Sequence, residues 1–133
     1  MSWDRFVVLH TRVEADLARS LQRGHGLGLS EYRALAELAK ASGGELRMQE
    51  LAVALGLNQS SVTRLVARLE EAGLTRRDLC PDDRRGVYSV ITDEGRAHLA
   101  DAVPTYERSL AAALEQADAD PALKPLVAMV RDS

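Results

Sequence analysis

The side chains with the clearest chemical potential lie in a short stretch from Gln59 to Arg68. It carries two arginines four positions apart, together with an amide and three hydroxyl groups: Gln59, Ser60, Ser61, Thr63, Arg64 and Arg68. Guanidinium groups bind phosphate and guanine in a bidentate manner, and short hydroxyl or amide side chains hydrogen-bond to the edges of bases. These residue types, close together on one helix, predict a surface that contacts nucleic acid. The alternative interpretation is an ordinary solvated helix face.

The same stretch has the pattern of an amphipathic helix. Apolar residues recur at helical spacing on its other side: Val62, Leu65, Val66 and Leu69. A shorter helix is predicted over 48–55, with Gly56 as its left-handed stop and Asn58 as the N-cap of the next helix, over 59–72. Two short helices joined by a tight glycine turn form a helix-turn-helix, whose second helix enters the major groove of DNA.

Basic side chains occur at two further places near this motif. Arg47 stands where the helix over 48–55 needs an N-cap, which costs about 1 kcal/mol but places a guanidinium where it can contact a phosphate. Two short runs, 74–79 and 86–91, predict a β-hairpin because turn residues separate them and β-branched residues fill the second. At the hairpin loop, Arg84 and Arg85 are predicted to reach a minor groove, with Asp83 orienting Arg85. A surface cluster of ion pairs is the alternative for these residues.

Further helices flank this region. One is predicted from about residue 3 to 21, because glycines at 24, 26 and 28 should end it. Another begins near Ser30, and a short extended piece follows at 45–47. After the hairpin, Thr92 is predicted to cap a long helix that continues to about 117, and a short helix ends the chain.

Composition limits the classes of protein that remain. The chain has 133 residues, enough for one domain, and a net charge of −3, so any attraction to nucleic acid must come from a local patch. Between 47 and 85 there are seven arginines and six acidic residues, a slight basic excess. No apolar run is long enough for a membrane span and no secretory signal is recognisable, so we expect a cytoplasmic protein without a membrane partner. The three histidines are scattered and there is one cysteine, so we expect no metal site. The sequence has no phosphate-binding loop and no nucleophile motif, so we expect neither a cofactor nor an enzyme.

Several motifs together resemble those of the MarR family of bacterial regulators. The matching segments are 29–35, 51–57, 61–66, 69–74, Asp83-Arg84-Arg85 and Thr92-Asp93-Glu94-Gly95. The wing motif followed by this helix start is specific in combination. The resemblance implies a mainly α fold with a small β-hairpin wing, that is, a winged helix-turn-helix with N- and C-terminal dimerisation helices. The implied division is a dimerisation helix at 1–28, a DNA-binding domain at 29–91 and dimerisation helices at 92–133.

The resemblance also implies a function. It indicates a homodimer that binds double-stranded DNA at a pseudo-palindromic operator and represses transcription until a small phenolic or lipophilic effector, or oxidation, releases it. Phe6 and His10 are candidates for an effector pocket and, alternatively, for dimer packing together with Trp3. Oxidant-sensing members carry a cysteine in the first helix, which this chain lacks, so the role of Cys80 stays open. A winged helix that docks on another protein without binding DNA is the alternative function.

Overall fold

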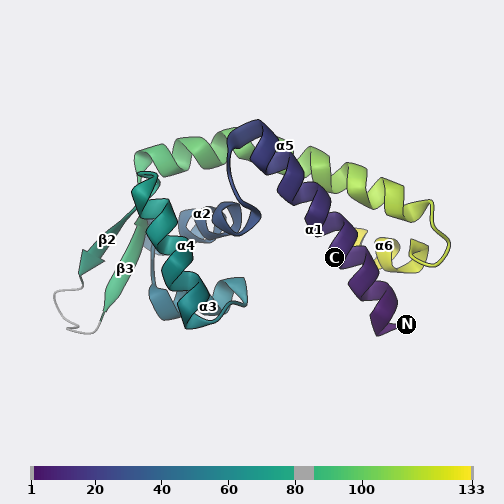
Figure 1. Ribbon diagram of the computed structural model, residues 1–133, viewed down its shortest axis with the longest axis horizontal. Coiled ribbons are helices and arrows are strands. Elements are labelled where there is room, and N and C mark those ends of the chain that lie inside the picture. Colours follow the sequence, from purple (N-terminus) through teal and green to yellow (C-terminus); the bar gives the residue numbers. More distant parts are fainter. Residues whose placement is uncertain (1, 80–85, 133) are drawn as a thin grey trace. The chain divides into compact units, whose positions relative to one another are not determined.

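The computed structural model describes residues 2–79 and 86–132. The chain divides into two compact units, one made of Met1–Leu29 with Ala102–Ser133 and the other of Ser30–Asp101. The elements in chain order (Figure 1) are α1 (Trp3–His25), α2 (Leu29–Lys40), η1 (Ser42–Gly44), β1 (Glu45–Arg47), α3 (Met48–Leu55), α4 (Gln59–Glu71), β2 (Thr75–Leu79), β3 (Val87–Ile91), α5 (Asp93–Asp118) and α6 (Lys124–Arg131).

The unit formed by Ser30–Asp101 combines helices α2, α3 and α4 with a small antiparallel sheet. In the described residues the strand order is β1-β3-β2, with Arg47 opposite Tyr88 and Thr75 opposite Ile91. The core of this unit is built largely from leucines that are almost fully buried: Leu35, Leu38, Leu51, Leu65 and Leu69. The predicted fold class, mainly α with a β-hairpin wing, is therefore confirmed, and the extended piece at 45–47 is the sheet's third strand.

The first turn of α5 is tied to the segment between α4 and β2. The Thr92 hydroxyl donates to the Gly73 carbonyl at 2.8 Å and accepts from the Gly95 N–H at 3.0 Å, so Thr92 caps the helix as predicted. The Thr92 N–H also donates to the Leu74 carbonyl at 3.1 Å. A Cβ at position 95 would collide with that same carbonyl oxygen, so only glycine allows this close approach of two backbone segments.

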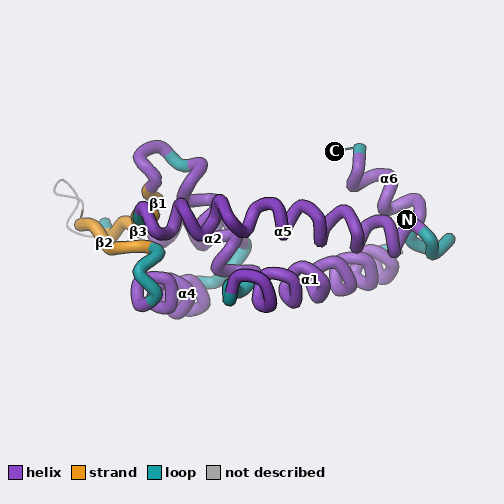
Figure 2. Tube along the Cα trace, turned by 90° about the horizontal axis from the view of Figure 1, so that it is seen from above, coloured by secondary structure: helices purple, strands orange, loops and turns teal. Residues whose placement is uncertain are grey.

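The other unit is helical in its described part. Helix α1 and the later turns of α5 run side by side, and α6 follows them (Figure 2). Hydroxyl groups link the two long helices, since Ser20 Oγ lies 2.9 Å from Ser109 Oγ. The buried apolar cluster of this unit contains Leu9, Leu114, Ala117, Leu123, Leu126 and Val127.

Helix α1 continues a full turn beyond the predicted end at residue 21. It reaches His25, and Gly26, with φ 60°, forms a left-handed C-cap. Gly24 lies inside the last turn, where glycine costs up to about 1 kcal/mol relative to alanine. A tertiary contact offsets this cost, because His25 Nε2 lies 2.7 Å from Thr105 Oγ1 on α5. The prediction was wrong because it weighed only local propensity.

Candidate nucleic-acid interface

The turn between α3 and α4 fixes where the second helix begins. Gly56 has φ 67°, and the next N–H, that of Leu57, donates to the Ala52 carbonyl at 3.0 Å, as in a glycine-terminated helix end. Asn58 Oδ1 accepts the Ser61 N–H at 2.9 Å, which satisfies one of the free amides of the first turn. Both local predictions, the glycine stop and the asparagine cap, are confirmed.

Helix α4 has one fully buried side and one open side. Val62, Leu65, Val66 and Leu69 are at most 1% exposed, so they fix the helix to its unit. The six residues predicted as a contact surface lie at the remaining positions. Five of them are exposed and Ser61 is half-buried: Gln59, Ser60, Ser61, Thr63, Arg64 and Arg68. The structure therefore gathers all six on the accessible part of one helix.

The polar groups on this open side keep hydrogen-bonding capacity. Ser60 Oγ donates to Asn58 Oδ1 and Thr63 Oγ1 donates to the Gln59 carbonyl, both at 2.9 Å, which leaves the hydroxyl lone pairs available as acceptors. Neither Arg64 nor Arg68 forms an ion pair with any other residue of the ranges 2–79 and 86–132. The two guanidinium groups are thus uncommitted within the described chain.

Charge is distributed unevenly along α4. Every residue of this helix is described, and its first turn contains no acidic side chain. The N-terminal end of a helix carries a partial positive charge and free N–H groups, which favour anions such as phosphate. The acidic residues Glu70 and Glu71 lie at the opposite end. The start of α4 is consequently the part of the helix best suited to approach a polyanion.

Arg47 has a structural role that the sequence did not indicate. Its Nε donates to Tyr88 Oη at 3.2 Å, and its guanidinium lies 5.6 Å from the centre of the Tyr88 ring. Its backbone N–H donates to Glu50 Oε1 at 2.9 Å, so the amide at the N-cap position is hydrogen-bonded although arginine is a poor cap residue. The glutamate three positions after Arg47 could have predicted this bond from the sequence. Nothing near Tyr88 in the sequence predicts its contact with Arg47, because strand pairing alone brings the two residues together.

The β2 strand is also joined to α4. Arg77 Nε lies 2.7 Å from Glu70 Oε1, and Arg76 lies 3.7 Å from Asp78 within the strand. The predicted tip residues Asp83, Arg84 and Arg85, like Cys80, lie outside the described residues.

Phe6 and His10, the candidates for an effector pocket, lie on an exposed side of α1. Phe6 stacks between Trp3 and His10, with ring centres 5.5 and 6.3 Å apart, and His10 Nε2 lies 3.4 Å from Glu14 Oε1. Neither residue lines the groove found between α1 and α5.

The described residues contain neither a cluster of metal ligands nor a membrane-spanning helix. In 2–79 and 86–132, no three His, Cys, Asp or Glu side chains come together as a metal site would require. Over the same residues, no helix combines the length and apolar character needed to cross a membrane.

Comparison with known proteins identifies relatives of this arrangement. The MarR family matches at residues 25–86. The crystal structure of Sco3205 from Streptomyces coelicolor, a MarR family transcriptional regulator in complex with DNA, is 33% identical, covers 97% of this chain and 81% of its own, and has a TM-score of 0.83.

Curated sequences agree with the structural comparison. A Thauera aromatica protein named as a regulatory protein for the hcr operon is 33% identical over 104 residues, 76% of this chain and 61% of its own. The transcriptional repressor MprA of Escherichia coli strain K12 is 26% identical over 88 residues, 66% of this chain and 50% of its own. The chain thus spans between half and two thirds of these curated relatives. Fold, motif and sequence identity lead to one conclusion: this chain belongs to the MarR family of transcriptional regulators.

Proposed function

We propose that the chain binds double-stranded DNA sequence-specifically, as a homodimer, and so regulates transcription. The observation that carries this proposal is the division of α4 into a fully buried apolar side and an open side of hydroxyl, amide and guanidinium groups. A helix held so firmly on one side can present the other to a major groove. The related Sco3205 was crystallised with DNA, which supports the same use of the fold.

Each side chain on the open side has an assigned task in this proposal. Gln59, Ser60, Ser61 and Thr63, near the start of α4, contact base edges or nearby phosphates, because short side chains let the backbone come close. Arg64 and Arg68 bind guanine or phosphate. Arg47 contributes a further positive charge at the start of α3. For the tip residues, which lie outside the described ranges, the proposal is that Arg85, oriented by Asp83, enters the flanking minor groove and that Arg84 is a further DNA contact.

A second copy of the chain is the proposed partner of the unit that contains α1 and α6. Large apolar side chains are exposed there, including Trp3 at 73%, Met129 at 55% and Val7 at 41%. Apolar side chains gathered in this way mark an interaction surface, and a two-fold dimer places two α4 helices about one turn of DNA apart. A pseudo-palindromic operator follows. Sedimentation of the purified chain should give a dimer, and Trp3→Ser should weaken it; a monomer at all concentrations contradicts this part.

Selection of bound sequences from random duplexes tests DNA binding, half-site symmetry and spacing together. The selected duplex is then titrated with Arg64→Ala and Ser61→Ala, with Lys40→Ala at the end of α2 as the control for loss of an exposed positive charge. We expect the α4 variants to lose roughly tenfold in specific binding but less in non-specific binding, and the control to lose nothing. Arg85→Ala should weaken binding and reduce its salt dependence. No retardation of any duplex at low salt would refute the proposal and favour docking on a protein instead.

We propose repression as the outcome of binding, in line with the name of MprA. A dimer bound over a promoter excludes polymerase, so a reporter behind the selected sequence should be silenced when the chain is expressed. Release by a small-molecule effector completes the proposal, since a ligand that binds one separation of the two α4 helices better than another shifts the population. If reporter output instead increases when the chain is expressed, the chain is an activator and not a repressor.

A further inference from the structure

Two hydroxyl groups near the start of α4 have their hydrogens already in use. Ser60 Oγ donates to Asn58 Oδ1 at 2.9 Å, and Thr63 Oγ1 donates to the Gln59 carbonyl at 2.9 Å. A hydroxyl group has one hydrogen and two lone pairs, so each of these oxygens presents only acceptor capacity to a ligand. Both side chains are exposed, and a duplex at the open side of α4 therefore meets them as acceptors.

The side chain of Asn58 fixes the direction of the Ser60 hydrogen bond. Asn58 Oδ1 also accepts the Ser61 N–H at 2.9 Å. A backbone N–H can only donate, so the carboxamide atom that faces it is the oxygen and not the nitrogen. Because the same oxygen faces Ser60 Oγ, the serine has to supply the hydrogen of that bond. One atom thus both caps the helix and makes Ser60 an acceptor.

The backbone fixes the direction of the Thr63 hydrogen bond. The Gln59 carbonyl can only accept, so Thr63 is the donor, as is usual when a threonine bonds to the carbonyl four positions before it. Thr63 lies three positions after Ser60, hence on the same side of the helix and about 4.5 Å further along its axis. Neighbouring base pairs are about 3.4 Å apart, so the two oxygens match neighbouring base pairs.

The polarity of these two oxygens limits which groups of DNA they can bind. Phosphate oxygens are acceptors, so they cannot hydrogen-bond to a hydroxyl whose hydrogen is already used. In the major groove the donors are the exocyclic amino groups, N4 of cytosine and N6 of adenine. Guanine O6 and N7 and thymine O4 are acceptors, and they suit the guanidinium groups of Arg64 and Arg68 instead. Acceptors and donors thus follow one another along the open side of α4.

We propose that Ser60 and Thr63 recognise amino groups of cytosine or adenine in neighbouring base pairs, and that Asn58 is a positioning residue that keeps Ser60 an acceptor. This proposal rests on the proposed DNA-binding function and narrows it, because it assigns both hydroxyl groups to one kind of base atom and to no phosphate. A hydroxyl that turned to donate to DNA would give up its bond to Asn58 Oδ1 or to the Gln59 carbonyl, which opposes that arrangement.

Base analogues that lack a single amino group test the proposal on the duplex selected from random sequences. Each adenine of one half-site is replaced in turn by purine and each cytosine by 2-pyrimidinone, and the affinity of the full chain is measured at fixed salt. We expect a loss of about fivefold at two neighbouring base pairs, the size of one hydrogen bond. Because each analogue also removes a base-pairing hydrogen bond, the loss is assigned to a protein contact only where a variant abolishes it.

Variants of the two hydroxyl residues identify the protein partner of each amino group. Ser60→Ala and Thr63→Val each remove one acceptor, and valine keeps the shape of threonine. Each variant should bind the unmodified duplex about fivefold more weakly and should bind one of the two analogue duplexes to within about twofold of the unmodified one. Thr63→Ser keeps the acceptor and should remain sensitive to the analogue. Arg68→Ala is the matched control on the same helix, because it removes a donor and should weaken binding to both duplexes equally.

Two variants of Asn58 separate its positioning role from its role as a helix cap. Asn58→Asp keeps an oxygen that faces Ser60 and Ser61, so sensitivity to the analogue at the Ser60 base pair should persist at whatever overall affinity results. Asn58→Ala removes that oxygen, and the sensitivity should fall towards that of Ser60→Ala. If Asn58 served only as a cap, Asn58→Ala would weaken binding to both duplexes equally, and the positioning role would be refuted.

The outcomes distinguish this proposal from the DNA-binding function on which it rests. If the loss on removal of an amino group is the same in Ser60→Ala and Thr63→Val as in the wild-type chain, the proposal is overturned while DNA binding stands. It is also overturned if either variant instead loses sensitivity to 7-deazaguanine or 7-deazaadenine, which lack the N7 acceptor, because the hydroxyl would then be a donor. A chain that binds no duplex refutes both the proposed function and this proposal.

Discussion

Gly95 provides the sharpest test of how the winged unit is assembled. It lies in the first turn of α5, where replacement by alanine would ordinarily stabilise a helix by up to about 1 kcal/mol. The structure predicts the opposite sign. A Cβ at this position would collide with the Leu74 carbonyl oxygen and lie 2.8 Å from Ile91 Cγ1, whereas real Cβ contacts essentially never fall below 3.0 Å.

The magnitude follows from what would have to move. Leu74 and Ile91 are 6% and 5% exposed, and the Leu74 carbonyl accepts the Thr92 N–H at 3.1 Å, so neither neighbour can yield cheaply. Overpacking in such a site costs about 1–3 kcal/mol, and a backbone obstacle places Gly95→Ala at the upper end. We expect a loss of about 3 kcal/mol in the free energy of unfolding, and a melting temperature lower by about 10 °C.

Urea and thermal unfolding, followed by circular dichroism at equal protein concentration, measure this loss. Gly24→Ala is the matched control, because it also lies in a helix but its nearest neighbour, Thr105 Cγ2, would be 4.0 Å away. The control should equal the wild-type chain or gain up to about 1 kcal/mol. If Gly95→Ala were as stable as Gly24→Ala, the backbone of α5 could not lie as close to the Leu74 carbonyl as the structure places it, and the reasoning would be refuted.

Three further substitutions test contacts around α4. Asn58→Ala removes the cap of the helix and should cost about 1 kcal/mol in urea unfolding, while weakening binding to the selected duplex; unchanged stability would contradict the cap. Tyr88→Phe keeps the ring under Arg47 but removes the hydroxyl acceptor, so a loss near 1 kcal/mol is expected, with Tyr88→Ala clearly worse. Arg77→Gln breaks the exposed pair with Glu70 and should cost less than about 1 kcal/mol; a larger loss would show that the pair is not an ordinary surface contact.

Features encoded by neighbouring residues could be predicted from the sequence. The glycine stop at Gly56, the caps at Asn58 and Thr92 and the buried stripe of α4 each depend on residues within about two turns. The structure reproduces all of them. For the same reason the predicted contact residues from Gln59 to Arg68 lie on one accessible helix.

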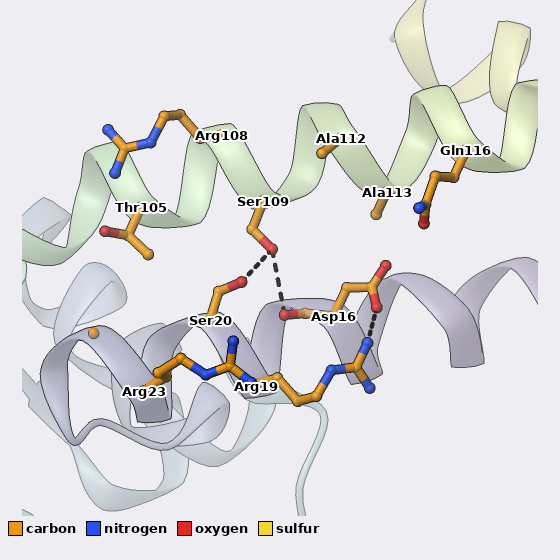
Figure 3. A pocket seen from close by; sticks show the side chains of 11 residues that line it. Asp16, Arg19, Ser20, Arg23, Thr105, Arg108, Ser109, Ala112, Ala113 and Gln116 are labelled. Carbon is orange, nitrogen blue, oxygen red and sulfur yellow. Dashed lines mark hydrogen bonds and ion pairs between the residues drawn. The ribbon is translucent and has the colours of Figure 1, made fainter.

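Features that depend on residues distant in the chain could not be predicted. Helix α1 continues past Gly24 because His25 is hydrogen-bonded to Thr105, which lies eighty positions away in the sequence. Arg47 meets Tyr88 through strand register, and no periodicity in the sequence marks that partner. The groove between α1 and α5 (Figure 3) joins segments about ninety positions apart, and no local pattern in the sequence brings these segments together.

The sheet of the winged unit is braced from both edges. Arg47 attaches β3 to the start of α3, and Arg77 attaches β2 to the end of α4. The Leu74 N–H also donates to the Leu69 carbonyl at 3.0 Å, so backbone hydrogen bonding holds the described base of the hairpin close to the end of α4. In the proposed complex, a duplex that is overwound or underwound between the two grooves would have to change its own twist to contact both α4 and the hairpin. The elastic cost of that change is a means of discrimination at base pairs that no side chain contacts.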